Sequence, residues 1–229
     1  MAFAKKSLYS DIDPREVPAY TIVDAARYLT VPYYTLHSWV RPIQFRADRE
    51  YSERPLIERP NASQHLSFLN LIEGHIVKAL LKTRSVPLAD LRQAVYYCER
   101  EFNIAHLFVH KDFKVGNRNL FIEKYGQHIN LSKGGQLTLS TLLDLHLDRV
   151  HYDGDLPVEL NPFVLDRVTK IVSISPYVAF GKPVVSDRKI TTEVIAERYE
   201  LGETEEELAR DYDIGREKIQ EAILYESTH

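Results

Sequence analysis

The chain has 229 residues, of which 44% are hydrophobic and 27% charged, and this ordinary globular composition excludes collagen-like, low-complexity and largely disordered proteins. A net charge of −4 argues against a protein that coats nucleic acid through bulk positive charge. The single cysteine, Cys98, excludes an internal disulfide and a thiolate zinc cluster. Because no run of about 18 apolar residues is present, we expect a cytoplasmic protein with no membrane partner.

Charge is unevenly distributed along the chain. Residues 1–60 carry nine Lys and Arg against eight Asp and Glu, residues 61–165 carry eleven against eleven, and residues 166–229 carry nine against fourteen. Proline-containing segments at 58–61 and 153–162 interrupt the hydrophobic periodicity and are candidate boundaries. The acidic excess therefore belongs to the C-terminal part.

The segment 20–40 predicts two short helices joined by a tight turn. Thr21 is placed to cap the first helix with Asp24 as its capping-box partner, and Pro32 suits the first turn of the second. The turn falls at Thr30, a position where glycine is common. Small residues at the helix crossing and an outward polar face on the second helix are typical of a helix-turn-helix. The crossing positions are Ala25 and Ala26, the inward ones Leu36 and Trp39, and the outward ones Tyr33, Tyr34, His37 and Ser38.

An arginine-rich stretch, 41–54, follows these helices and could form a wing along the phosphates, where charge rather than base identity sets the affinity. Interleaved acidic residues weaken this interpretation, and the alternative is an ordinary helical bundle with a solvated charged loop. The predicted nucleic-acid-binding residues are Tyr33, Tyr34, His37, Ser38, Arg41, Arg46 and Arg49.

The middle of the chain changes character twice. Apolar spacing predicts one amphipathic helix over 63–82 and a second from Pro87, with Cys98 on its buried stripe as an inert thiol. The β-rich runs within 107–139, separated by glycine-containing turns, predict antiparallel hairpins. Residues 142–150 are expected to be helical again.

The C-terminal block predicts short strands followed by three helices, at about 191–201, 204–212 and 216–225, with Thr204 and Glu207 as a capping box. The expected fold is α+β and mainly helical. It has an N-terminal winged helix-turn-helix, middle antiparallel hairpins, and a C-terminal trihelical domain of helix-turn-helix shape. The winged helix-turn-helix is expected over 1–102 and the trihelical domain, which would bind the partner protein, over 166–229. Residues 103–165 between them are expected to form a hairpin-rich connector with a helix, where a dimer interface could lie.

The N-terminal pattern resembles the winged helix-turn-helix of MerR-type proteins. The resemblance is carried by VDAARYLTVPYYTLHSWV, the wing-like stretch and the two following helices, and it covers roughly residues 18–102. It implies a protein that binds duplex operator DNA as a homodimer with the second helix in the major groove. The sequence departs from the family at His37, where MerR-type proteins commonly carry an arginine in a T-L-R-Y motif, so a permanent charge is replaced by a titratable one.

The C-terminal run at 170–226 is similar throughout to the family catalogued as domain of unknown function 433. The strand with S-I-S-P, the segment F-G-K-P-V-V, the segment I-T-T-E-V-I and the Glu-rich capped helix before Y-D-I occur in the family's order. Together with the MerR-like head, this tail resembles a VapB-type antitoxin. The resemblance implies a type II antitoxin that inhibits a PIN-like ribonuclease toxin and represses its own operon.

The tail's charge favours a protein partner over nucleic acid, because residues 193–207 contain seven glutamates and one arginine. A PIN-like nuclease holds metal with clustered carboxylates, so basic residues of an inhibitor could approach that pocket beside an apolar anchor. The expected partner-binding residues are Phe180, Lys182, Val184, Arg188 and Lys189. The alternative is that the apolar residues form the tail's own core and the basic ones are solvated.

No enzyme is expected, because phosphate loops, dinucleotide fingerprints and nucleophile elbows are absent. The acidic and histidine-rich segment 144–155 is better explained as a solvated helix and a turn than as a metal site, so neither metal nor cofactor is predicted. Two rival functions remain open: a stand-alone MerR-like transcriptional regulator, and a protein-interaction module that never touches DNA.

Overall fold

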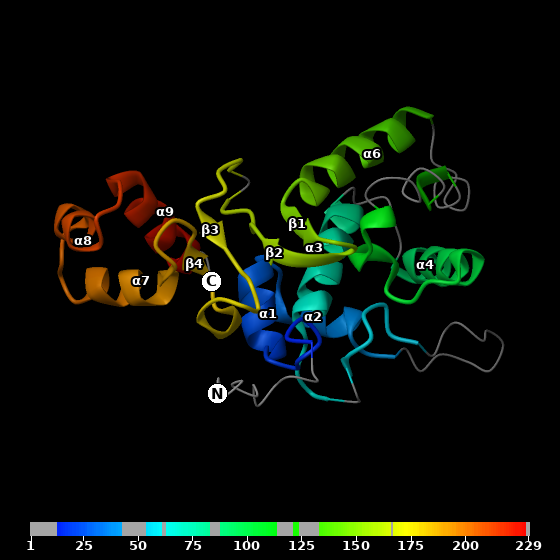
Figure 1. The fold of residues 1–229 in the computed structure, drawn as a ribbon. Helices are drawn as coiled ribbons and strands as arrows, with labels where there is room; N and C mark the ends of the chain where they lie inside the picture. Colours follow the sequence, from blue (N-terminus) through cyan, green and yellow to red (C-terminus); the bar gives the residue numbers. More distant parts are fainter. Residues whose placement is uncertain are drawn as a thin grey trace, which may run out of the picture.

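The computed structural model describes residues 13–42, 54–60, 63–82, 88–113, 121–123, 133–165 and 167–227. These form a mainly helical α+β fold with a two-stranded and a three-stranded antiparallel sheet, as the sequence predicts. None of the described helices is long and apolar enough to cross a membrane. Figure 1 shows the C-terminal helices at one end of the molecule and α4 and α6 at the other, with α1 and α2 between them.

The predicted helix-turn-helix is confirmed as α1 (Ile22–Leu29) and α2 (Tyr33–Trp39). The Thr21 side chain accepts a hydrogen bond from the backbone N–H of Asp24, which satisfies one of the free donors at the start of α1. Pro32 is the residue just before α2. Side-chain capping thus sets the start of α1, whereas α2 begins directly after a proline without a side-chain cap.

The core is built around α3 (Phe68–Lys82), which is buried on nearly every side. It is contacted by α1 of the N-terminal part and by two elements of the middle part, α6 (Lys133–Leu147) and the short 3₁₀ helix η2 (Leu107–Val109). Helix α4 (Leu88–Phe102) contacts η2, and its Cys98 is buried as predicted. One continuous cluster of buried apolar residues runs from Tyr20 to Ile174, so it crosses the boundary predicted at 102/103.

The hairpins predicted within 107–139 are wrong wherever the structure describes this segment. Residues 107–109 form η2, residues 121–123 are helical, and α6 begins at Lys133, with the two glycines of the supposed turn in its first turn. Three consecutive residues, Leu107 to Val109, are buried, which an alternating strand on a single core cannot achieve. The remaining parts, 114–120 and 124–132, lie outside the described residues.

The antiparallel hairpin of the middle region lies further along, at β1 (Val150–Asp153) and β2 (Leu156–Leu160). The predicted helix over 142–150 therefore ends at Leu147. The segment taken as a boundary supplies the hairpin turn, where Gly154 has a φ of +64°. The hydrophobic periodicity breaks at this segment because the chain reverses direction in a hairpin. The same core cluster contains residues before and after the turn, so no boundary lies there.

The C-terminal part, here called the tail, contains β3 (Val172–Ser173), η4 (Ala179–Gly181), β4 (Val184–Val185) and β5 (Ile190–Thr191). Its three predicted helices are confirmed as α7 (Thr192–Glu200), α8 (Glu205–Tyr212) and α9 (Arg216–Ser227). Thr204 and Glu207 form the predicted capping box. A small separate core fills the tail, made of Val185, Ile195, Leu208, Ile219 and Ala222.

The tail is joined to the rest of the molecule through backbone and buried side chains. Leu160 of β2 and Ile174 exchange backbone hydrogen bonds, with N···O distances of 2.9 and 2.8 Å. The Asn161 side chain donates to the carbonyl of Val172 at 3.0 Å. At the other end, the Tyr225 hydroxyl of α9 donates to the carbonyl of Tyr28 in α1 at 3.1 Å. The tail therefore contacts the helix-turn-helix directly.

Candidate nucleic-acid and partner interfaces

The turn of the helix-turn-helix is held by a lysine from α3. Thr30 adopts the left-handed conformation, with a φ of +52°, that glycine commonly supplies at this position. Lys78 Nζ donates to the carbonyl of Leu29 at 2.8 Å and also to the Thr30 hydroxyl, which compensates for the unfavourable backbone. Threonine is therefore tolerated here because a neighbouring helix fixes the turn.

Helix α2 presents the predicted aromatic face to solvent. The Tyr34 side chain is 82% exposed and Tyr33 is 41% exposed, while Leu36 and Trp39 are buried on the opposite side. Tyr33 stacks on His37 with ring centroids 5.4 Å apart and meets Tyr34 edge to face. These rings restrain one another, so the face that would meet bases or phosphates is partly organised before any contact.

The C-terminal end of α2 is capped by a buried arginine that the sequence did not single out. Arg92 of α4 donates from Nη2 to the carbonyls of Ser38, at 2.6 Å, and Arg41, at 3.3 Å. A cation at a helix C-terminus complements the helix dipole. The exposed Arg41 follows directly, whereas Arg46 and Arg49 lie outside the described residues. The structure thus gathers Tyr33, Tyr34, His37, Ser38 and Arg41 on and just beyond α2.

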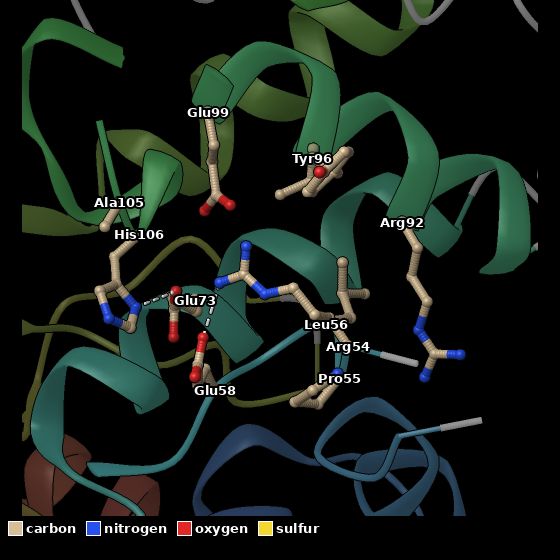
Figure 2. A pocket seen from close by; sticks show the side chains of 11 residues that line it. Arg54, Pro55, Leu56, Glu58, Glu73, Arg92, Tyr96, Glu99, Ala105 and His106 are labelled. Carbon is tan, nitrogen blue, oxygen red and sulfur yellow. Dashed lines mark hydrogen bonds and ion pairs between the residues drawn. The ribbon is translucent and has the colours of Figure 1, made fainter. Parts of the chain in front are cut away.

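A buried polar network lies on the α4 side of α3, around a cavity of about 50 Å³ (Figure 2). Asn70 donates to Glu73 at 2.9 Å, and Glu73 in turn accepts from His106 Nδ1 at 2.9 Å. The hydrogen bond to Glu73 raises the pKa of His106 to about 9, so this imidazole is protonated at neutral pH. Burial also raises the pKa of Glu99 across the cavity.

A second pair of histidines is buried where α3 meets α6. The His75 and His146 rings lie 4.6 Å apart, and His75 Nε2 contacts the backbone carbonyl of His146 at 3.1 Å. Burial lowers the pKa of His146 to about 4 and that of His75 well below its usual value. Within the described residues, no three His, Cys, Asp or Glu side chains are grouped so that they could hold a metal ion.

The most exposed of the large aromatic side chains that the structure describes in the tail lies on a constrained turn. Phe180 is 97% exposed, and Ala179, Phe180 and Gly181 have consecutive positive φ values of 46°, 55° and 81°. Gly181 lies against Tyr20 of the N-terminal part, where an added Cβ would be 2.2 Å from the Tyr20 hydroxyl. Such backbone conformations are costly for non-glycine residues and occur preferentially at functional sites.

Of the other residues predicted for the tail surface, one is buried and three are exposed. Val184 is buried in β4, so it belongs to the tail's interior and is not an exposed anchor. Lys182 is exposed and pairs with Glu193 at 2.6 Å, and Arg188 pairs with Asp213. Lys189 is exposed and has a φ of +57°. The exposed set is therefore Phe180, Lys182, Arg188 and Lys189, with two of the three cations held in ion pairs.

Comparison with protein families matches two segments of the chain. Residues 18–95 match a family described as "Putative DNA-binding HTH domain", and residues 172–225 match one described as "Protein of unknown function (DUF433)". The first contains α1 to α4 up to Val95, and the second contains the tail from β3 to α9. The two ends of the chain are thus similar to two different families, one described as a putative DNA-binding domain and one of unknown function.

Two curated proteins of Mycobacterium tuberculosis (strain ATCC 25618 / H37Rv) match nearly the whole chain. "Uncharacterized protein Rv2308" is 24% identical, covering 97% of this chain and 94% of its own, and "Putative antitoxin VapB45" is 20% identical, covering 91% and 93%. The fold is similar to the crystal structure of Rv2018 from M. tuberculosis, with a TM-score of 0.68, 18% identity, and coverage of 90% of this chain and 98% of that one.

Proposed function

We propose that this chain is the antitoxin of a type II toxin-antitoxin system, which binds a PIN-like ribonuclease through its tail and represses its operon through α2. The observation that carries the proposal is the separation of two exposed surfaces on one fold. An aromatic and basic face lies on a helix-turn-helix, and Phe180 projects from a constrained turn of the tail. The name of the relative VapB45 supports the antitoxin assignment.

The charges of the two surfaces fit different partners. Within the tail, α8 begins with three consecutive glutamates, which would repel phosphates. Around α2 the exposed groups are the rings of Tyr33 and Tyr34, Ser38 and Arg41, with the half-buried His37 beside them. These groups can stack, donate hydrogen bonds or contact phosphates. We therefore assign DNA binding to the α2 surface and binding of a protein partner to the tail.

Replacing Tyr34 with alanine or Arg41 with glutamine is expected to weaken binding to the upstream DNA. Removing one good base or phosphate contact should cost about 1–3 kcal/mol, roughly a 5- to 150-fold loss of affinity. Electrophoretic mobility shifts over a series of salt concentrations provide the measurement. The Arg41 variant should also have a shallower salt dependence.

Tyr97→Ala is the matched control, because Tyr97 is a half-exposed tyrosine on α4. An unchanged shift for Tyr34→Ala and Arg41→Gln would remove α2 as the DNA-reading element. No shift by the wild-type chain at any salt concentration would leave only the protein-interaction function.

Replacing Phe180 with serine is expected to reduce capture of the toxin at least tenfold without changing the DNA shift, because a fully exposed aromatic anchor is typical of an interface hot spot. Co-expression of the tagged chain with the product of each adjacent gene, scored by co-purification and rescue of growth, identifies the partner and measures the loss. Arg188→Glu is expected to weaken inhibition in the same assay.

Leu201→Ser is the control for Phe180→Ser, because Leu201 is also highly exposed but follows α7, outside the η4 turn. If Phe180→Ser inhibits as well as wild type, the turn is not the anchor. If no neighbouring product co-purifies while the DNA shift persists, the chain is a stand-alone regulator instead.

A further inference from the structure

A groove of about 450 Å³ lies between the turn of the helix-turn-helix, the C-terminal end of α3 and the segment just after β2. This volume is within the roughly 300–1,000 Å³ of small-molecule sites. Apolar side chains line much of the groove, among them Trp39 from α2, Leu81 from α3, and Phe163 and Leu165 from the segment after β2. None of the described residues that line it is acidic. The groove therefore has the size and the apolar walls that a small organic molecule requires.

Two lysines of α3 give the groove a positive charge. Lys78 and Lys82 both line it, and because they are four residues apart they lie on the same face of the helix. Lys78 also donates to the carbonyl of Leu29, at 2.8 Å, so the groove shares this lysine with the turn of the helix-turn-helix. Burial is the main cause of the low pKa of His146, and the charges of Lys78 and Lys82 lower it further. The positive field of the two lysines thus extends to the core beside the groove.

The wall that carries Phe163 and Leu165 is held in place by a buried arginine. Arg149 lies over the Phe163 ring, with its Cζ atom 4.1 Å from the ring centroid. Its guanidinium also donates to the carbonyls of Thr169 and Arg167, which fixes the segment that follows. Leu165 is 58% exposed and has a φ of +48°, a costly conformation for a leucine that occurs preferentially at functional sites. Arg149 therefore adds a third cation behind an apolar wall whose shape the fold imposes.

We propose that this groove binds a small organic anion, an aromatic or branched aliphatic molecule with one carboxylate. Its apolar body would pack on Trp39 and Phe163, and its carboxylate would lie between Lys78 and Lys82. Charge-assisted hydrogen bonds from ammonium groups to a carboxylate are stronger than those to a neutral group, so the anion is favoured over its neutral analogue. A nucleic-acid backbone fits less well, because a phosphate has no apolar body to fill the groove.

Pyrenebutyrate and its neutral counterpart pyrenebutanol test the proposal, because the two probes share an apolar body and differ in the carboxylate. Trp39 is the chain's only tryptophan and lines the groove, so energy transfer from its emission to pyrene reports binding near it. Titration of the full chain should give one pyrenebutyrate per chain, with a dissociation constant on the order of 10 µM. Pyrenebutanol should bind at least tenfold more weakly.

Two variants separate the charge from the apolar wall. Lys82→Glu should weaken binding of pyrenebutyrate at least tenfold and leave that of pyrenebutanol unchanged, with Lys111→Glu, at an exposed lysine outside the groove, as the matched control. Leu165→Asn should weaken binding of both probes, because asparagine tolerates the left-handed backbone but lacks the apolar contact. Val168→Asn is its control, since Val168 is exposed on the same segment but does not line the groove.

Three results would overturn the proposal. The first is the absence of energy transfer to pyrenebutyrate at concentrations up to about 200 µM. The second is equal affinity for the two probes, or equal binding of pyrenebutyrate by Lys82→Glu and Lys111→Glu, because the groove would then not recognise an anion. The third is equal binding by Leu165→Asn and Val168→Asn, which would place the probe elsewhere. These titrations use neither DNA nor toxin, so their outcome is independent of the proposed function.

Discussion

Replacing Tyr225 with alanine is expected to lower the free energy of unfolding by about 3–5 kcal/mol, the range for deleting a buried aromatic side chain. Tyr225 is fully buried, and it belongs to the cluster with Val164 and Val172 between α9 and the start of the tail. Its hydroxyl reaches the carbonyl of Tyr28 in α1, so the same side chain fills a core and joins the tail to the helix-turn-helix. Both roles are lost together in the alanine variant.

Urea unfolding followed by fluorescence measures this effect. Trp39 is the only tryptophan and is buried in α2, so its emission reports on the helix-turn-helix and not on the site of mutation. Tyr225→Phe keeps the volume and should lose only about 1 kcal/mol for the hydrogen bond. An alanine variant as stable as the phenylalanine one would mean that the tail does not support the head. The same conclusion would follow if the urea transition reported by Trp39 fluorescence were unchanged in the alanine variant although its tail unfolds.

The free energy of unfolding is expected to be greatest near pH 6.5 and to fall on both sides. On the alkaline side the cause is His106, whose folded pKa of about 9 exceeds the ordinary value of 6.5. Its contribution is complete below pH 6.5 and is lost as the pH rises through about 9. Because the His106 side chain is partly exposed, solvent screening reduces this contribution below what the pKa shift alone would give.

On the acid side the cause is the buried pair His75 and His146. Their folded pKa values lie below 6.5, at about 4 for His146, so they contribute fully above pH 6.5 and the contribution is lost as the pH falls toward 4. For His146 alone, which is almost fully buried, the total loss from the plateau well above pH 6.5 down to pH 5 is about 2 kcal/mol.

Urea titrations at several pH values and fixed protein concentration test the two limbs separately. His106→Gln should flatten the alkaline limb and leave the acid limb unchanged. His146→Leu should flatten the acid limb, because it removes the ring but keeps the backbone carbonyl that contacts His75. His65→Gln alters an exposed histidine and is the control. A variant profile parallel to that of wild type would exclude the corresponding histidine as the cause.

The helix-turn-helix and the tail helices could be predicted from sequence because their determinants are local. The capping pairs Thr21 with Asp24 and Thr204 with Glu207 lie three residues apart and fix helix starts by themselves. The outward face of α2 follows from the positions of Leu36 and Trp39 in the same turn pair. The identity of Thr30 as the left-handed residue could also be expected, but its support by Lys78 could not, because that contact comes from 48 residues away.

The middle region could not be predicted because its alternating apolar and polar runs are compatible both with strands and with short helical segments whose apolar residues are buried. LFV and the phenylalanines after it suit a strand, but Phe108, Phe113 and Phe121 instead form a cluster of edge-to-face rings 5.1–5.7 Å apart. Burial in three dimensions therefore overrides the local β preference. The Asp-Gly-Asp run signals a turn, but it does not say whether the turn ends a domain or joins two paired strands.

The buried polar groups were also missed, because nothing in the local sequence distinguishes them from solvated ones. Glu73 lies on an apolar helix, 33 residues before His106, and Arg92 caps a helix more than 50 residues earlier. The signal for Glu73 was a carboxylate on a strongly apolar helix, where a buried charge requires a partner that the local sequence does not identify. On the tail, Phe180 could be proposed as an anchor, but the burial of Val184 depends on the sheet register of β3, β4 and β5.

The pairing of Leu160 with Ile174 has a consequence for dissecting this protein. A fragment ending before the tail would leave β2 as an open edge, with unsatisfied N–H and carbonyl groups that can pair with another chain. It would also uncover Tyr28 and the Asn161 amide, which the tail now satisfies. Such a fragment is expected to aggregate, so deletion cannot separate the two proposed activities. Point variants on the intact chain are the means to test each of them.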